Sequence, residues 1–203
     1  LLTGATGLLG TEIIRCLGQQ HVIPLSTNDC DLRSTTAQGY INEKIKQHDV
    51  DCIVHCAAKV GGVKANSEQN AAFFDENILM NMNVVKSCNS AGIKLVSVLS
   101  TCVYPDAQFI DYPLTEVQLH KGPPHESNFG YAYAKRALEV QSRAYRRQYG
   151  NNFISVIPNN LYGPNDNYDS LSSHVIPALI RRFYEAKIAN KPSVTVWGSG
   201  KCL

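Results

Sequence analysis

A tyrosine and a lysine in the segment "FGYAYAKRALEV", residues 129–140, are spaced to form a proton-transfer centre. Tyr131 and Lys135 stand four residues apart, so on a helix both side chains lie on one face. Tyr133 would point away from Lys135 by about half the helix circumference, which favours a packing or surface role. An ammonium beside a phenol lowers the pKa of the phenol. The spacing therefore predicts Tyr131 as a proton donor that Lys135 tunes.

The size of the required shift points to a cofactor beside this pair. A free phenol has a pKa of about 10, and lowering it by about three units takes roughly 4 kcal/mol of differential stabilisation. One exposed ion pair supplies less than that. An oxidised nicotinamide carries positive charge, and we expect such a ring near Tyr131 to supply the rest. Without the surrounding elements, the same spacing also fits an exposed tyrosine beside a solvated lysine.

Strands and helices alternate along the chain. Short apolar runs predict strands at 21–25, 51–56, 94–100 and 152–158. Helical stretches are predicted near 8–17, 35–48, 70–90 and 129–149. This alternation predicts an α/β fold, a doubly wound parallel sheet with helices on both faces. A proline-containing loop at 101–128 follows the fourth strand, and loops of that length inside a compact domain usually serve a site.

The first turn carries a glycine pattern that suits a dinucleotide. Gly4, Gly7 and Gly10 give G-x-x-G-x-x-G between a strand and a helix. Glycine lets the backbone approach a pyrophosphate closely, and the helix N-terminus offers it free N–H groups. Ser100 ends the fourth strand, where side chains of such a sheet face the ligand crevice. Its hydroxyl is placed to hold a carbonyl that Tyr131 protonates, so the sequence predicts a dinucleotide-dependent reduction.

The choice between NAD and NADP stays open on the residues alone. An acid at the tip of the second strand would hold the ribose 2′-hydroxyl of NAD, and an arginine would hold the phosphate of NADP. Ser26, Thr27 and Asn28 follow the second strand and give neither signal. Asp29 and Asp31 come slightly later, and they suit a cap for the turn before the next helix equally well.

Composition narrows the class of protein. The 203 residues are 18% charged with a formal charge of +2, so no basic field indicates nucleic acid binding. No apolar run is long enough to span a membrane, and the opening residues are too glycine-rich for a signal sequence. Seven cysteines at irregular spacings, without a C-x-x-C pair or a histidine cluster, favour free thiols over disulfides or a metal site. We therefore expect a cytoplasmic location.

The glycine turn, Ser100 and the Tyr131–Lys135 pair, in this order, resemble the short-chain dehydrogenase/reductase superfamily, and "HCAAKVGG" (55–62) is similar to its extended branch, which acts on nucleotide sugars. Five further segments make the resemblance more specific within that branch: "LSTCVYP", "GPPHESNFGYAYAK", "IPNNLYGPNDNY", "SSHVIPALIRRF" and "VTVWGSG". Together these segments resemble the GDP-L-fucose synthase family over essentially the whole chain. The resemblance implies conversion of GDP-4-keto-6-deoxy-D-mannose to GDP-L-fucose, by epimerisation at C3 and C5 and then NADPH-dependent reduction of the C4 ketone.

The resemblance also implies roles for individual residues. Cys102 matches the base and His174 the acid of the epimerisation, and a thiol and an imidazole both suit proton transfer near neutrality. Tyr131 and Ser100 would stabilise the enolate and then serve the reduction, while Lys135 holds the nicotinamide ribose. Taken singly, Cys102 also fits core packing and His174 a helix cap or packing residue.

Further positions match family contacts with the cofactor and the substrate. The implied NADP-binding residues are Gly4, Ala5, Thr6, Gly7, Leu8, Leu9, Gly10, Asp31, Leu32, Ala57, Ala58, Val98, Leu99, Ser100, Thr101, Lys135, Pro158, Asn159, Asn160, Leu161 and His174. Arg182 and Trp197 match residues that hold the nucleotide of the GDP-sugar, although Arg182 equally fits a solvated helix position. The implied organisation is a Rossmann domain at 1–160, the start of a substrate domain at 161–203, and a homodimer through the helices near 70–90 and 129–149.

Some positions depart from the family pattern. Asn28 and Asp29 stand where a basic residue is common, and Thr6 stands where some members have arginine, so NADP preference rests on the resemblance. The family continues beyond the point where this sequence stops, so we expect a fragment whose own activity is in doubt. The alternatives are another nucleotide-sugar enzyme, a 4-epimerase or 4,6-dehydratase, and a non-catalytic dinucleotide-binding module. A dehydratase would need an acid beside Ser100, which Thr101-Cys102 does not offer.

Overall fold

The computed structural model describes residues 1–169 and 173–196, and within them parallel strands form one sheet in the order β2-β1-β3-β4-β5. The strands are β1 (Leu2–Thr3), β2 (Pro24–Leu25), β3 (Cys52–His55), β4 (Lys94–Val98) and β5 (Phe153–Val156). The strand order reverses between β1 and β3, because β2 pairs on one side of β1 and the later strands extend from the other. The predicted doubly wound α/β fold is confirmed, with strands shorter than the apolar runs that predict them.

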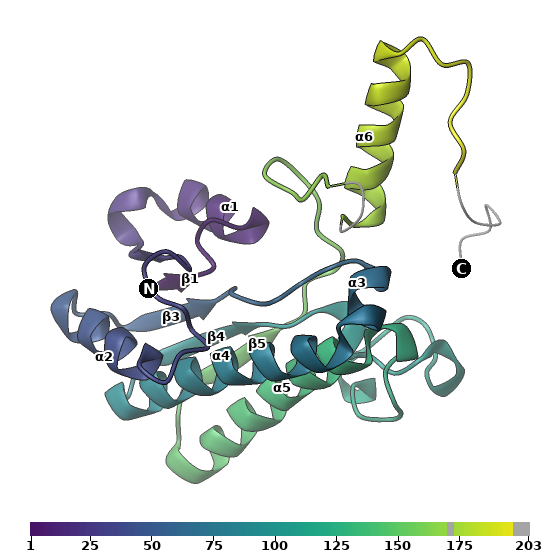
Figure 1. The fold of residues 1–203 in the computed structure, drawn as a ribbon. Coiled ribbons are helices and arrows are strands. Elements are labelled where there is room, and N and C mark those ends of the chain that lie inside the picture. Colours follow the sequence, from purple (N-terminus) through teal and green to yellow (C-terminus); the bar gives the residue numbers. More distant parts are fainter. Residues whose placement is uncertain (170–172, 197–203) are drawn as a thin grey trace.

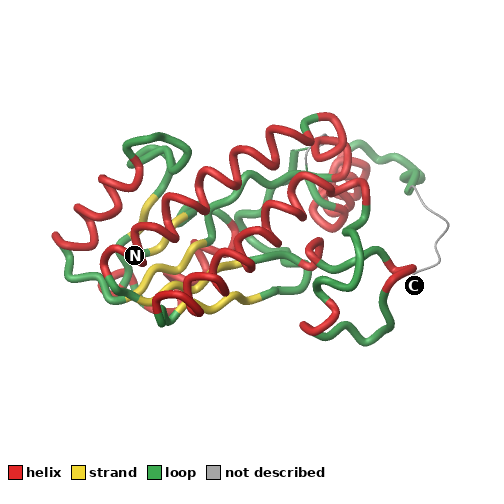
Figure 2. The backbone as a smooth tube through the Cα atoms, turned by 90° about the horizontal axis from the view of Figure 1, so that it is seen from below, coloured by secondary structure: helices red, strands yellow, loops and turns green. Residues whose placement is uncertain are grey.

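Helices lie on both faces of this sheet (Figure 1). The long helices α4 and α5 share one face with α2, whereas α1 lies on the other face and α6 stands apart from the sheet. Figure 2 shows α4 and α5 running side by side across the strands. The bounds are α1 (Leu8–Leu17), α2 (Ala37–Gln47), α3 (Val63–Glu68), α4 (Asn70–Ala91), α5 (Phe129–Tyr149) and α6 (Val175–Ile188). The sequence did not predict α3, which directly precedes α4.

The hydrophobic core lies between the sheet and the layer of α2, α4 and α5. Ile53, Leu95 and Phe153 are fully buried on the central and edge strands. The helices contribute Ile41, Ile45, Val84, Val85, Cys88 and Leu138 to the same cluster. Burying an aliphatic side chain of this size contributes about 2 kcal/mol. This packing fixes the strands, and with them the carboxyl ends from which the candidate site residues extend.

The loop after β4 is held against α5 by a buried arginine. Arg136 donates from Nε to the Val103 carbonyl oxygen at 2.6 Å and from Nη1 to the Gly122 carbonyl oxygen at 2.8 Å. Short 3₁₀ turns divide the loop at Thr101–Val103, Ala107–Phe109, Glu116–Gln118 and Glu126–Asn128. The predicted long loop is therefore an ordered segment, and its first turn is fixed beside the helix that carries Tyr131.

The cysteines of the described residues are all free thiols; they are Cys16, Cys30, Cys52, Cys56, Cys88 and Cys102. Cys202 lies outside the described residues.

Within residues 1–169 and 173–196, no cluster of three histidine, cysteine or acidic side chains is arranged to hold a metal ion. None of the helices in the described part of the chain is both long and apolar enough to cross a bilayer.

Candidate active site

The turn after β1 lies directly against the end of β3. Gly4 has a φ of +68°, and a Cβ at this position would come within 2.7 Å of the Ala57 backbone nitrogen. A Cβ on Gly10 would come within 2.2 Å of the Gly4 carbonyl oxygen. Gly7 is the N-cap of α1, so the first N–H groups of that helix open at this turn. The glycine pattern thus builds a cradle without side chains at the point where the strand order reverses.

A cavity of about 310 Å³ opens beside this cradle. The predicted cofactor residues that line it are Gly4, Thr6, Asp31, Leu32, Ala57 and Ala58. The residues that the sequence did not predict there are Leu25, Ser26, Thr27, Cys30, Arg33, Lys59, Glu76 and Met80. Lys59 lies within the "HCAAKVGG" motif, which could have identified it. Arg33 and Glu76 carry no local signal, because they meet only when the loop after β2 folds onto α4.

Four charged side chains form a network in the wall of this cavity. The Nη2 of Arg33 lies 2.8 Å from an Asp31 carboxylate oxygen, and the Nη1 of Arg33 pairs with Glu76. Lys59 donates to the other Glu76 oxygen at 2.6 Å. The adjacent guanidinium lowers the pKa of Asp31 to about 2. Asp31 is therefore ionised at neutral pH, and Arg33 neutralises it.

Asp29 has a different role from Asp31. Its carboxylate accepts hydrogen bonds from the Ser26 hydroxyl at 2.6 Å and from the Ser26 backbone N–H at 2.8 Å. These bonds lower the pKa of Asp29 and close the turn after β2. Of the two uses that the sequence left open for Asp29, the structure shows the cap.

Tyr131 and Lys135 extend from the first turns of α5 toward the end of β4. The Nζ of Lys135 lies 5.9 Å from the centre of the Tyr131 ring and donates to the Val98 carbonyl oxygen at 2.8 Å. Burial lowers the pKa of Lys135 to about 8. Burial, followed by the nearby Cys102 thiol, raises the pKa of Tyr131, and a hydrogen bond with Ser100 opposes this. The protein groups alone thus raise the pKa of Tyr131, because burial outweighs the hydrogen bond with Ser100, and the predicted lowering still depends on the charge of an oxidised nicotinamide.

Ser100 and Cys102 meet Tyr131 at the end of β4. The Cys102 backbone N–H donates to the Ser100 hydroxyl oxygen at 3.4 Å and closes the turn Thr101–Val103. Both side chains are half-buried, and both act on the pKa of Tyr131. The structure thus brings Ser100, Cys102, Tyr131 and Lys135 together, as the sequence predicted.

The loop after β5 joins this group from the next strand. The Thr101 hydroxyl donates to the Asn160 side-chain oxygen at 3.3 Å, which links the turn after β4 to the predicted nicotinamide loop at 158–161. Leu99 and Ala5, which the sequence predicted as cofactor residues, are each 3% exposed, and their backbone N–H groups donate to the Val156 and Leu25 carbonyl oxygens. The predicted cofactor residue Val98 uses its carbonyl to accept from Lys135.

The predicted residues of the C-terminal part are less closely tied to this group. His174 is exposed at the N-cap of α6, and among the described residues no hydrogen bond joins it to Cys102. The half-buried Arg182 donates to the Thr195 carbonyl oxygen at 3.5 Å. Trp197 lies outside the described residues. A bond of 3.4 Å from the Asn165 side chain to Thr11 holds the segment before α6 against α1, beside the glycine turn.

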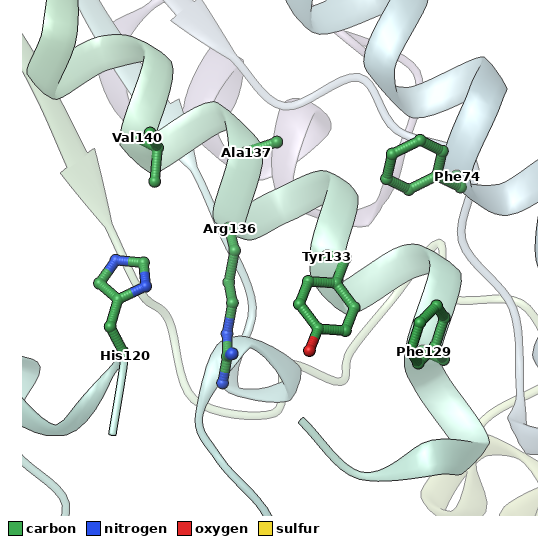
Figure 3. A pocket seen from close by; sticks show the side chains of 7 residues that line it. All are labelled: Phe74, His120, Phe129, Tyr133, Arg136, Ala137 and Val140. Atoms are coloured by element: carbon green, nitrogen blue, oxygen red, sulfur yellow. The ribbon is translucent and has the colours of Figure 1, made fainter. Parts of the chain in front are cut away.

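A larger hollow, of about 520 Å³, lies along the other side of α5 (Figure 3). It is lined by Phe74, His120, Phe129, Tyr133, Arg136, Ala137 and Val140. The Tyr133 ring packs here against the Phe129 ring, with 4.7 Å between their centres. This placement confirms that Tyr133 faces away from Lys135 and leaves Tyr131 as the tyrosine of the candidate site.

A family model described as the NAD dependent epimerase/dehydratase family matches residues 1–203, the whole chain. The chain belongs to this family. Members of the family with similar sequences carry one recurring name. A GDP-L-fucose synthase of Dictyostelium discoideum is 44% identical over 100% of this chain and 63% of its own length. A GDP-L-fucose synthase of Escherichia coli is 36% identical over 98% of this chain and 62% of its own length.

The fold of this family member also matches a solved structure. A GDP-L-fucose synthetase from Naegleria fowleri, bound to NADP, superimposes with a TM-score of 0.82 and 38% identity. The match covers 98% of this chain and 65% of that protein. The chain thus spans a little over three-fifths of the length of the curated relatives it matches.

Proposed function

We propose that this chain carries the catalytic centre of an enzyme that converts GDP-4-keto-6-deoxy-D-mannose to GDP-L-fucose. The observation that supports this most strongly is the group of Ser100, Cys102, Tyr131 and Lys135 beside a glycine cradle. The group occurs in a chain that is 44% identical to a GDP-L-fucose synthase. A serine, a tyrosine and a lysine would supply the protein groups for reduction of a ketone by a bound dinucleotide, and the cysteine would add a base for epimerisation.

The residues present fit a dinucleotide, because the glycine cradle is closed to side chains and opens at the N-terminus of α1. NADPH, when bound, supplies the hydride for the reduction. Tyr131 would give its proton to the C4 oxygen, and its raised pKa keeps that proton in place at neutral pH. Lys135 donates one N–H to the Val98 carbonyl oxygen, so its ammonium has two further N–H groups that would bind the ribose hydroxyls.

The epimerisation would use the same ketone. The protons at C3 and C5 are acidified by the adjacent carbonyl, and inversion requires a base on one face and an acid on the other. Cys102 adjoins Tyr131, so its thiolate would remove the proton while Tyr131 and Ser100 stabilise the enolate oxygen. His174, at the start of α6, would return a proton from the opposite face.

NADPH is proposed over NADH because a similar synthetase was solved with NADP bound. In this chain, positive charge at the cavity comes from Arg33 and Lys59, since Thr6 and Asn28 are uncharged. Both cations pair with Glu76 on α4. A 2′-phosphate at this wall would therefore have to compete with the Glu76 carboxylate for these two cations.

Three further parts of the proposal concern the whole enzyme. Arg182 and Trp197 would contact the nucleotide of the GDP-sugar, and residues 161–203 would begin the substrate domain. A homodimer would form through α4 and α5, whose outward side chains include the exposed Phe74, Leu79 and Val140. The free thiols of the described cysteines suit a reducing compartment, which supports the cytoplasm.

One assay tests both reactions. The purified protein is supplied with the keto-deoxy GDP-sugar and NADPH in deuterated water, and we expect deuterium at C3 and C5 together with NADPH oxidation. Cys102→Ser should lose the deuterium exchange and keep much of the hydride transfer, whereas Cys16→Ser, at an exposed site on α1, should keep both. Exchange that persists in Cys102→Ser would show that another group is the base, and absence of both reactions in the wild type would refute the proposed function.

A further inference from the structure

A buried chain of hydrogen bonds crosses the molecule beneath the candidate active site. The Ala57 backbone N–H donates to the Thr3 hydroxyl oxygen at 3.2 Å, and that hydroxyl lies 2.7 Å from the Nδ1 of His55. The Nε2 of His55 lies 3.1 Å from the Asn81 side-chain oxygen. The Asn81 amide donates to the Ala134 carbonyl oxygen at 3.3 Å. The chain therefore begins at the cofactor cavity and ends beside Lys135.

The two ends of this chain fix the direction of every bond in it. The Ala134 carbonyl can only accept, so Asn81 must present its NH₂ there and its oxygen to His55. His55 must then carry its proton on Nε2 and accept at Nδ1 from the Thr3 hydroxyl. That hydroxyl keeps a lone pair for the Ala57 N–H, which can only donate. The Nε2–H tautomer of His55 therefore satisfies all four hydrogen bonds. A second proton on the ring would add no further bond.

The surroundings of His55 hold it in this neutral state. Thr3, His55 and Ala134 are completely buried, and Asn81 is 1% exposed. Burial, followed by the charge of Lys135, lowers the pKa of His55 to about 3. The titratable groups near it are Lys135 from α5 and Cys56 from the end of β3, and burial raises the pKa of Cys56 to about 11. Neither neighbour supplies a negative charge that would hold an imidazolium at neutral pH.

We propose that His55 is a positioning residue, which ties the cofactor loop at Ala57 to the turn of α5 that carries Tyr131 and Lys135. The ring joins four elements, since Thr3 ends β1, His55 ends β3, Asn81 lies in α4 and Ala134 in α5. The distance from the nicotinamide to the phenol depends on how these elements sit relative to one another. The proposal rests on the proposed function, because it assigns the tie to hydride transfer.

The first measurement tests this connection between the cofactor loop and α5 without requiring any catalytic activity. In ¹⁵N spectra of the full chain, we expect His55 as the neutral Nε2–H tautomer at neutral pH. His55→Phe keeps the ring size and removes both bonds, so amide exchange should rise about tenfold at Ala57 and at 131–138 together. His55→Gln, which can accept and donate, should restore much of the protection. Ser87→Ala removes another buried bond of α4 and should leave both segments unchanged.

The second measurement is the rate of NADPH-dependent reduction. A misplacement of about 1 Å between the cofactor and the catalytic turn lowers kcat by about a hundredfold, so His55→Phe should lose kcat with little change in KM for NADPH. His55→Gln should recover most of it. An Nδ1–H tautomer, unchanged exchange in His55→Phe, or a wild-type kcat in that variant would each overturn the proposal. An inactive wild type with the expected exchange pattern would refute the proposed function and leave the tie standing.

Discussion

At the scale of single residues, Lys135 shows the conflict between stability and chemistry. The side chain is 2% exposed, has no carboxylate partner in the described part of the chain, and donates to the Val98 carbonyl. Burial lowers its pKa from 10.5 to about 8. Charging this amine therefore costs free energy in the folded state, a cost that is accepted where a buried cation serves a site.

The sign of this cost gives a prediction for Lys135→Met. Between pH 8 and 10.5 the unfolded chain binds a proton that the folded chain lacks, so the stability contributed by Lys135 rises with pH across that window. Below pH 8 the full penalty applies, on the order of 3 kcal/mol. Lys135→Met should therefore unfold at higher urea concentration than the wild type at pH 7, while losing ketone reduction.

The matched control for that experiment is Lys46→Met, at an exposed position near the end of α2. Its unfolding free energy should stay close to that of the wild type, because this exposed side chain loses little contact with water on folding. The difference between wild type and Lys135→Met should shrink as pH rises from 8 to 10.5. A Lys135→Met variant that is less stable at pH 7, with a difference independent of pH, would contradict the assignment.

At the scale of elements, α4 and α5 approach closely where α5 begins. A Cβ on Gly130 would come within 2.2 Å of the Asn70 carbonyl oxygen and 2.6 Å of the Asn70 side-chain oxygen. The obstacle is backbone, which cannot turn aside as the end of a flexible side chain can. Gly130 therefore sets the separation of the two helices one residue before Tyr131.

Gly130→Ala should consequently destabilise the protein by about 2 kcal/mol and displace the Tyr131 turn. Gly39→Ala is the matched control, because a Cβ on Gly39 in α2 has no neighbour within 4 Å. That variant should gain as much as about 1 kcal/mol from helix propensity. Urea unfolding of both variants measures the effect, and equal stability of the two would show that α4 and α5 have room to separate.

The elements also show how far the sequence determines the site. The helices predicted near 70–90 and 129–149 agree with α4 and α5 within one residue at each end, and the glycine spacing placed the cofactor cradle. The Tyr131–Lys135 spacing identified the pair but gave no sign of the burial that raises the phenol pKa, since burial is a tertiary property. The Arg33–Glu76 pair was missed for the same reason: its partners are 43 residues apart and meet only in the folded chain.

At the scale of the molecule, α4 and α5 present apolar side chains on the surface that faces away from the sheet. Phe74, Leu79, Met82, Phe129 and Val140 are between 38% and 48% exposed. The hollow of Figure 3 lies among them and has aromatic rings in its wall. A second copy related by a twofold axis would cover the same patch on each protomer, which agrees with the proposed homodimer.

Val140→Asp tests this assembly, because the new carboxylate would be buried at the proposed interface and would lose its hydration there. We expect the sedimentation coefficient to fall from that of a dimer to that of a monomer at equal concentration. Val117→Asp is the control, since Val117 is 81% exposed on the loop turn Glu116–Gln118. It should sediment as the wild type does. A wild type that sediments as a monomer across the concentration range would exclude the dimer, and identical dimers in both variants would place the interface on another face.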